Sequence, residues 1–182
     1  MENKEVNIKV NMTSKDIDLI KEMLQKQAKL DKTIMDEYGL DEIDEEKLNM
    51  AILDEVGELT HELKANWCWW KKTQAPVDND KVLGELVDIW HFVLSYQNNF
   101  YNGTSICDGI DNFLNGCGLY IEMIVNEKIP LSIILCDIIQ FKLHKVHALI
   151  AITEYLGFTI EQVYEAYCEK NKINYQRLKE GY

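Results

Sequence analysis

The chain has 182 residues, of which 47% are hydrophobic, and a formal net charge of −12. The apolar fraction predicts one domain with a sizeable core, and the acidic charge argues against a protein that binds duplex nucleic acid by neutralising phosphates. Five scattered cysteines without a CxxC pair indicate reduced thiols, and the sequence has neither a signal-peptide pattern nor an apolar run of bilayer length. We therefore expect a cytoplasmic protein that binds neither membranes nor, stably, nucleic acid.

Helical periodicity, with capping residues at the segment ends, extends over most of the chain. A first helix should follow a cap at Thr13 or Ser14 and stop at Gly39. The last helix should begin at the capping-box pair Thr159 and Gln162. No segment has the alternation of a strand. The chain is therefore predicted to be all-α, a bundle with helices at 17–38, 44–67, 81–101 and 160–174 and one or two more between 129 and 157.

The second predicted helix carries a group of carboxylates beside its apolar stripe. Glu55, Glu58 and Glu62 recur at spacings of three and four, so they share one side of the helix. No lysine follows at i+4 to pair with any of them. A charge run of this kind is usually a solvated face, and taken alone it does not indicate a site.

The third predicted helix is apolar around nearly its whole circumference, except for one polar side. Glu85, Asp88 and His91 lie on that side, with no lysine or arginine on the same face. An antiparallel pair of these two helices would bring Glu55 and Glu58 close to the two acidic residues of the third helix, where four anions repel one another. A divalent cation removes this conflict, and an all-oxygen ligand set suits Mg²⁺ or Mn²⁺. We therefore predict a metal site between the two helices.

The pair Glu55-x-x-Glu58, followed after a loop by Glu85-x-x-Asp88, resembles the motifs of the all-α nucleoside triphosphate pyrophosphatases, which include the dimeric dUTPases and the MazG-like enzymes. Further stretches, QAKLDKTI, LDEVGELTHE, GELVDIWHFVLS and AYCEKNKINYQRLKEGY, are most similar to the dimeric dUTPases of bacteria and their phages. The resemblance implies a single domain over 1–182, with a four-helix catalytic core and a family-variable helical region at about 106–149.

The resemblance also implies a reaction, the hydrolysis of dUTP (and of dUDP) to dUMP, with pyrophosphate released from dUTP and Mg²⁺ or Mn²⁺ as the cofactor. Water would attack the β-phosphorus, with Glu55 as the general base. The implied metal ligands are Glu55, Glu58, Glu85 and Asp88; the implied base contacts are Gln27, Trp69, His91 and Phe92; the implied phosphate or sugar contacts are Lys71, Lys170, Asn171, Asn174, Arg177 and Tyr182; and the supporting residues behind them are Asp31 and Glu62.

Other interpretations of the same residues stay open. His91 and Trp69 are also compatible with a purely structural role. A MazG-like or dCTP-directed pyrophosphatase would use the same metal site, and a phage helical regulator that binds a repressor protein would need no catalysis. The resemblance implies a homodimer in the cytoplasm of a bacterial or phage-infected cell. Any repressor-binding surface is expected in the region of about 106–149.

Overall fold

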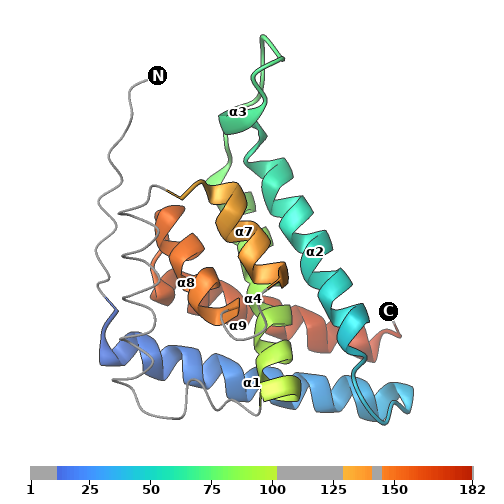
Figure 1. The fold of residues 1–182 in the computed structure, drawn as a ribbon. Helices are drawn as coiled ribbons and strands as arrows, with labels where there is room; N and C mark the ends of the chain where they lie inside the picture. Colours follow the sequence, from blue (N-terminus) through green and yellow to red (C-terminus); the bar gives the residue numbers. More distant parts are fainter. Residues whose placement is uncertain (1–11, 102–128, 141–144, 182) are drawn as a thin grey trace.

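The computed structural model describes residues 12–101, 129–140 and 145–181. Within these ranges the chain forms helices and loops and no strand, which confirms the all-α prediction (Figure 1). The region predicted to vary, about 106–149, lies mostly outside them. The helices are α1 (Ser14–Tyr38), α2 (Glu45–Glu62), α3 (Lys64–Trp67), α4 (Asn79–Tyr101), α7 (Leu131–Gln140), α8 (Lys145–Tyr155) and α9 (Ile160–Lys179).

The helices α1 and α9 begin at capping residues, and α1 also ends at one. Thr13 caps α1 in a capping box with Asp16, and Thr159 caps α9 in the same way with Gln162. Gly39 ends α1 in the left-handed conformation, with φ 63°, which glycine adopts without steric strain. α9 runs to Lys179, five residues beyond the predicted end at 174.

The second predicted helix, 44–67, is divided in the structure, so this prediction was wrong at its carboxyl end. α2 ends at Glu62 because Leu63 leaves the helical backbone conformation, with φ −80° and ψ 6°. The Leu63 side chain stays in the core while the chain turns into the short α3. The indole N–H of Trp67 donates to the carbonyl oxygen of Thr60 at 2.8 Å, which holds α3 against the end of α2.

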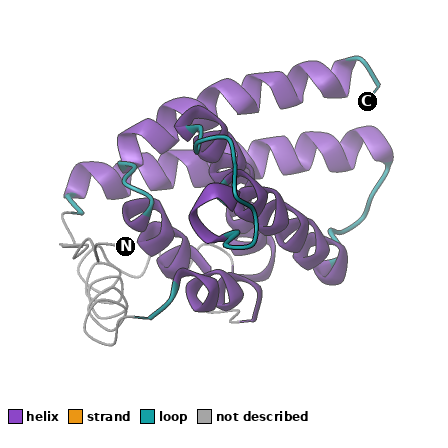
Figure 2. Cartoon of the chain, turned by 90° about the horizontal axis from the view of Figure 1, so that it is seen from above, coloured by secondary structure: helices purple, strands orange, loops and turns teal. Residues whose placement is uncertain are grey.

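α4 lies at the centre of the molecule and contacts α1, α2, α8 and α9. α2 packs along α4 and runs antiparallel to it, as predicted for the two helices with acidic pairs (Figure 1). α1 and α9 lie side by side and run in the same direction (Figures 1 and 2). α7 and α8 pack against each other and complete the cover of α2 and α4. The junction of α1, α2, α4 and α9 is where the site lies.

α4 is buried along most of its length because it presents apolar residues to neighbours on several sides. Leu86, Ile89 and Trp90 have no exposed surface. The indole N–H of Trp90 donates to the hydroxyl of Thr153 on α8 at 3.1 Å, which satisfies the polar group that burial would otherwise leave unpaired. Among the described helices, none combines the length and the apolarity that a membrane span requires.

Candidate active site

Three of the predicted carboxylates meet between α2 and α4. Glu55, Glu58 and Glu85 each offer one oxygen, and these oxygens lie within 4.8 Å of one another. The i, i+3 spacing places the first two on one face of α2, and the antiparallel packing of α4 brings Glu85 opposite them. A cluster of hard oxygen ligands of this kind suits Mg²⁺ or Mn²⁺.

Burial and mutual repulsion oppose full ionisation of this cluster. Burial raises the pKa of Glu55 to about 7, and the negative charges of Asp88, Glu58 and Glu85 contribute to the rise. Burial also raises the pKa of Glu85, again with help from the charges of its acidic neighbours. Glu55 Oε2 is buried and has no hydrogen-bond partner among the described residues. An oxygen in that position, with raised pKa values around it, fits a site for a divalent cation.

Asp88 stands slightly apart from the other three carboxylates. Its Oδ2 accepts a hydrogen bond of 2.6 Å from Nζ of Lys170 on α9, and the two side chains are 16% and 29% exposed. The positive charge of Lys170 also opposes the rise in the pKa of Glu55. α9 therefore brings a cation to the acidic pairs of α2 and α4.

A cavity of about 430 Å³ lies at this junction. Acidic groups from α2 and α4 and basic groups from α9 contribute to its wall, together with apolar side chains of α1. A volume of this size and a mixed apolar and charged lining are typical of a small-molecule site. The lining residues are Gln27, Leu30, Ile34, Tyr38, Glu55, Glu58, Asp88, His91, Phe92, Lys170, Asn174, Arg177 and Leu178.

A buried polar network forms another part of the cavity wall. Gln27 is 4% exposed, and its Oε1 accepts hydrogen bonds of 2.8 Å from both the Tyr167 hydroxyl and Nδ1 of His91. Its Nε2 donates to Oδ1 of Asp31 at 2.7 Å. The rings of His91 and Tyr167 stack with their centroids 4.0 Å apart. Burial lowers the pKa of His91 to about 3, so its imidazole is neutral at physiological pH.

The structure brings most of the predicted residues of α9 to the site. Lys170, Asn174 and Arg177 line the cavity, at spacings that keep them on one side of the helix. Asn171 is buried instead, and its Nδ2 has no hydrogen-bond partner among the described residues. Tyr182 lies outside the described residues.

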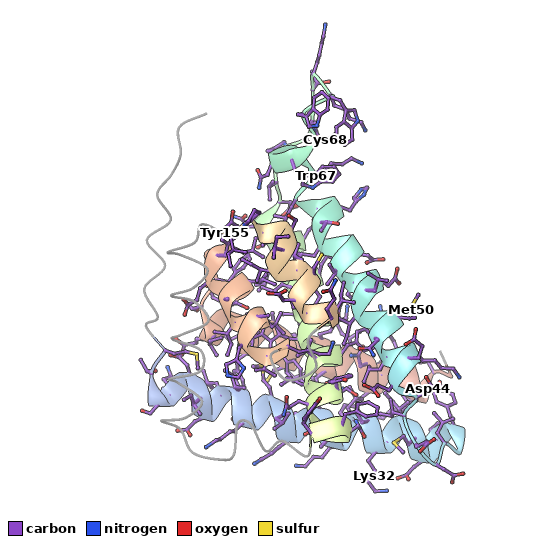
Figure 3. All side chains as sticks on the ribbon, in the orientation of Figure 1. Lys32, Asp44, Met50, Trp67, Cys68 and Tyr155 are labelled. Atoms are coloured by element: carbon purple, nitrogen blue, oxygen red, sulfur yellow. The ribbon has the colours of Figure 1, made fainter. Side chains whose placement is uncertain are left out.

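Besides Glu85 and Asn171, four other predicted site residues in the described ranges do not line the cavity. Asp31 lies behind Gln27, where it supports the amide. Glu62 is the last residue of α2. Trp69 is 86% exposed and Lys71 is exposed, both in the loop that follows α3. Figure 3 shows that this end of the molecule, marked by Trp67 and Cys68, projects away from the helical body. The assignments of these side chains to base or phosphate contacts stay predictions.

Sequence reasoning missed Tyr167, although it is central to the polar network. Its ring has no exposed surface and its hydroxyl bonds to Gln27. The signal was present in the spacing of Val163, Tyr167 and Asn171, which recur every four residues and form the buried face of α9. The aliphatic residues of the cavity wall, Leu30, Ile34 and Leu178, were also missed, because an isolated leucine or isoleucine carries no chemical signal.

An all-α fold with paired acidic motifs over such a cavity is the arrangement expected of a nucleotide pyrophosphatase. The sequence matches the dUTPase family over residues 19–182, so the chain belongs to this family, the all-α dUTPases, and is a nucleotide pyrophosphatase. This finding confirms the family resemblance and the enzyme class predicted from the sequence. A comparison with curated proteins finds no match.

Proposed function

We propose that the protein hydrolyses dUTP to dUMP and pyrophosphate, and dUDP to dUMP and phosphate. The observation that carries this proposal is the meeting, at one cavity, of a carboxylate cluster and a buried polar network. Glu55 and Glu58 line the cavity from α2, while Gln27 lines it from α1 and His91 from α4. The first pair suits a metal-bound phosphate chain, and the second suits a flat polar ring such as a pyrimidine.

The four acidic residues Glu55, Glu58, Glu85 and Asp88 would hold Mg²⁺, with Mn²⁺ as a substitute. When bound, the ion supplies positive charge to the phosphate oxygens and lowers the pKa of a water molecule. Glu55 is proposed as the general base that takes the proton of the water attacking the β-phosphorus. The buried Oε2 of Glu55, which has no hydrogen-bond partner among the described residues, supports that role, because this oxygen is free to accept a proton.

The remaining residues would bind and orient the nucleotide. Phe92 and His91 line the cavity and would contact the base, while Lys170, Asn174 and Arg177 would contact the phosphates or the sugar. Phosphoryl transfer depends mainly on such positioning and charge neutralisation. By resemblance, Trp69, Lys71, Asn171 and Tyr182 complete these contacts, and Glu62 supports the metal ligands.

The first test is pyrophosphate release from dUTP, dCTP, dTTP and UTP in the presence of Mg²⁺. We expect dUTP to be the preferred substrate and Glu55→Gln to lower kcat by about 100-fold or more, since a positioned general base contributes that much. Asp54→Asn is the matched control, because Asp54 is the neighbouring residue on α2 but is exposed and lies outside the cavity lining.

Turnover of dCTP, or of several nucleotides equally, would contradict the dUTP assignment and favour a dCTP-directed or MazG-like activity. The absence of any turnover would contradict catalysis and favour a helical regulator that binds a repressor protein. Most of the region in which such a surface is expected, about 106–149, lies outside the described residues.

We also propose that the protein forms a homodimer, as the resemblance implies. The outer face of α2 supports this proposal, because Met50 and Leu53 are 55% and 43% exposed there, and Met50 projects from the helical body in Figure 3. Exposed apolar side chains that cluster on one face are typical of association surfaces. Light scattering after size exclusion should give twice the 21.3 kDa chain mass, and a mass of one chain would contradict the proposal.

A further inference from the structure

Three side chains, Asp31, Gln27 and His91, form a hydrogen-bonded series that ends at the cavity. Oδ1 of Asp31 accepts from Nε2 of Gln27 at 2.7 Å, and its Oδ2 accepts from Nδ2 of Asn99 at 3.2 Å. Burial raises the pKa of Asp31, while the hydrogen bonds from Gln27 and Asn99 oppose this rise. In the ionised form that these bonds favour, the carboxylate can only accept hydrogen bonds. Asp31 therefore determines which way the Gln27 amide faces, because turning it over would place two oxygens against each other.

The orientation of Gln27 in turn determines the tautomer of His91. With its nitrogen facing Asp31, Gln27 presents Oε1 to Nδ1 of His91 at 2.8 Å and to the Tyr167 hydroxyl at 2.8 Å. A carbonyl oxygen can only accept, so Nδ1 must carry the proton. Because His91 is neutral, its Nε2 then carries none and is a hydrogen-bond acceptor.

The resulting acceptor has no partner of its own. His91 lines the cavity, and its Nε2 is buried without a hydrogen bond from any described residue. A buried polar atom left in this state is unfavourable, and a ligand that supplies a donor would remove that cost. His91 Nε2 can therefore accept a hydrogen bond from a ligand ring that carries an N–H group.

We propose that Asp31 is a positioning residue which, through Gln27, holds His91 as the Nδ1–H tautomer, so that His91 Nε2 accepts the imide N3–H of the base. The inference rests on the proposed function, and it explains selection for uracil over cytosine. Uracil carries a hydrogen at N3, whereas cytosine presents a lone pair there, which would face the lone pair of His91. Thymine shares the imide N3–H, so this device does not distinguish uracil from thymine.

The variant Asp31→Asn tests the series with almost no change in shape. Its new amide can donate to Oε1 of Gln27, which allows the Gln27 amide to turn over and present its nitrogen to His91. Nδ1 of His91 must then accept, and the proton moves to Nε2. Asp36→Asn is the matched control, since Asp36 lies on the same helix but is exposed and paired with Lys32.

The first measurement is the tautomer of His91 in the free protein, read from nitrogen NMR of histidine-labelled samples, with His91→Asn used to assign the signal. We expect the Nδ1–H form in the unmodified protein and in Asp36→Asn, and the Nε2–H form in Asp31→Asn. Tyr167→Phe should keep the Nδ1–H form, because it leaves the Asp31–Gln27 bond intact. An Nε2–H form in the unmodified protein would overturn the proposal, whether or not any variant folds.

The second measurement is kcat/KM for dUTP, dCTP and dTTP. A site built around one hydrogen bond to the base should favour dUTP over dCTP by about 100-fold or more. Asp31→Asn should reduce this preference to below about 10-fold while leaving the ratio of dUTP to dTTP unchanged. An unchanged preference in a folded Asp31→Asn variant would overturn the proposal.

The outcomes separate this inference from the proposed function. If no nucleotide is hydrolysed, the proposed function fails, and calorimetry with dUMP and dCMP replaces the rates. Tighter binding of dUMP that is lost in Asp31→Asn would then still support the role of Asp31. Equal binding of the two monophosphates would overturn it. Turnover of dUTP with an Nε2–H histidine would leave the proposed function intact and remove only the inference.

Discussion

At the scale of single residues, the contact between Lys170 and Asp88 links two roles. Lys170 donates to an aspartate that is a predicted metal ligand, and it also lines the cavity as a predicted phosphate contact. The ammonium group balances part of the negative charge of the neighbouring glutamates. A divalent cation at the carboxylates would compete for the same charge, so metal binding should free Lys170 for the nucleotide.

Lys170→Gln should therefore destabilise the metal-free protein, because Asp88 would remain partly buried beside three other acidic residues. We expect a loss of about 1–3 kcal/mol in the free energy of unfolding, and a larger rise in Tm on addition of Mg²⁺ than in the unmodified protein. Thermal unfolding with and without Mg²⁺ measures both effects.

Lys172→Gln is the control for this prediction, since Lys172 pairs with Glu169 in a fully exposed contact that should contribute little. Equal destabilisation by the two substitutions would contradict a special role for Lys170. An identical response of Lys170→Gln and the unmodified protein to Mg²⁺ would contradict competition between the lysine and the metal.

The candidate site could be predicted from the sequence where residues carry distinctive chemistry at helical spacing. Glu55, Glu58 and Glu85 were predicted to meet, and their oxygens do meet. The ion pair of Asp88 was not predicted, because the spacing within α4 does not reveal which residue of α9 packs opposite. The exposure of Trp69 was not predicted either, because the sequence does not specify the direction of the loop after α3.

At the scale of elements, α8 carries a partly buried acidic group that has no ion-pair partner among the described residues. Glu154, on α8, has an Oε2 that is buried without a partner among the described residues. Burial, with a smaller contribution from the charge of Asp16, raises its pKa to about 7. The ionised form of Glu154 is therefore unfavourable in the folded protein.

This burial predicts a pH-dependent penalty that Glu154→Gln should remove. Below about pH 4.5 the carboxyl is protonated in both folded and unfolded chains, so the substitution should change little. Between pH 4.5 and 7 the unfolded chain ionises first, and the folded protein loses stability as pH rises. Above pH 7 the variant should be more stable by about 1 kcal/mol, allowing for partial solvent screening.

Urea unfolding at pH 4.5 and pH 8 measures this difference. Glu161→Gln is a suitable control, because Glu161 lies in the same part of the molecule but is exposed in an ion pair with Lys15. A stabilisation that is equal at both pH values would indicate a packing effect and contradict the electrostatic explanation.

The helices themselves were predictable where their ends are marked by chemistry. The caps at Thr13 and Thr159 and the stop at Gly39 appear in the structure as expected. The break at Leu63 was not predictable from periodicity, because Leu63 continues the apolar stripe of α2 and is buried like its other members. A change in backbone direction that keeps a side chain in the core leaves no trace in the hydrophobic pattern.

At the scale of the whole molecule, the apolar core stabilises the fold independently of the carboxylate cluster. The core is built from side chains such as Ile20, Ile52 and Trp90, which are fully buried by protein contacts alone. Glu55, Glu58 and Asp88 line a cavity at the junction of four helices. The fold is therefore expected to form without metal, and metal binding should add stability to it.

Removal of metal with a chelator should leave the helical circular dichroism signal unchanged and lower Tm only modestly. Addition of Mg²⁺ should raise stability by mass action, by about 2.7 kcal/mol at a concentration of 100 times Kd. Ca²⁺, which prefers more ligands at longer distances, is the comparison ion and should give a different shift. A loss of helical signal on chelation would contradict the independence of the core from the metal.

The position of three site residues on one helix fixes the distances between them. Tyr167 contacts Gln27, Lys170 contacts Asp88, and Arg177 lines the cavity further along α9. With a rise of about 1.5 Å per residue, Tyr167 and Arg177 are separated by about 15 Å along the helix axis. α9 therefore sets the distance between the polar network and the charged groups. One residue inserted after Tyr167 would rotate all later positions by about 100°, and would separate the two halves of the site more completely than any single substitution.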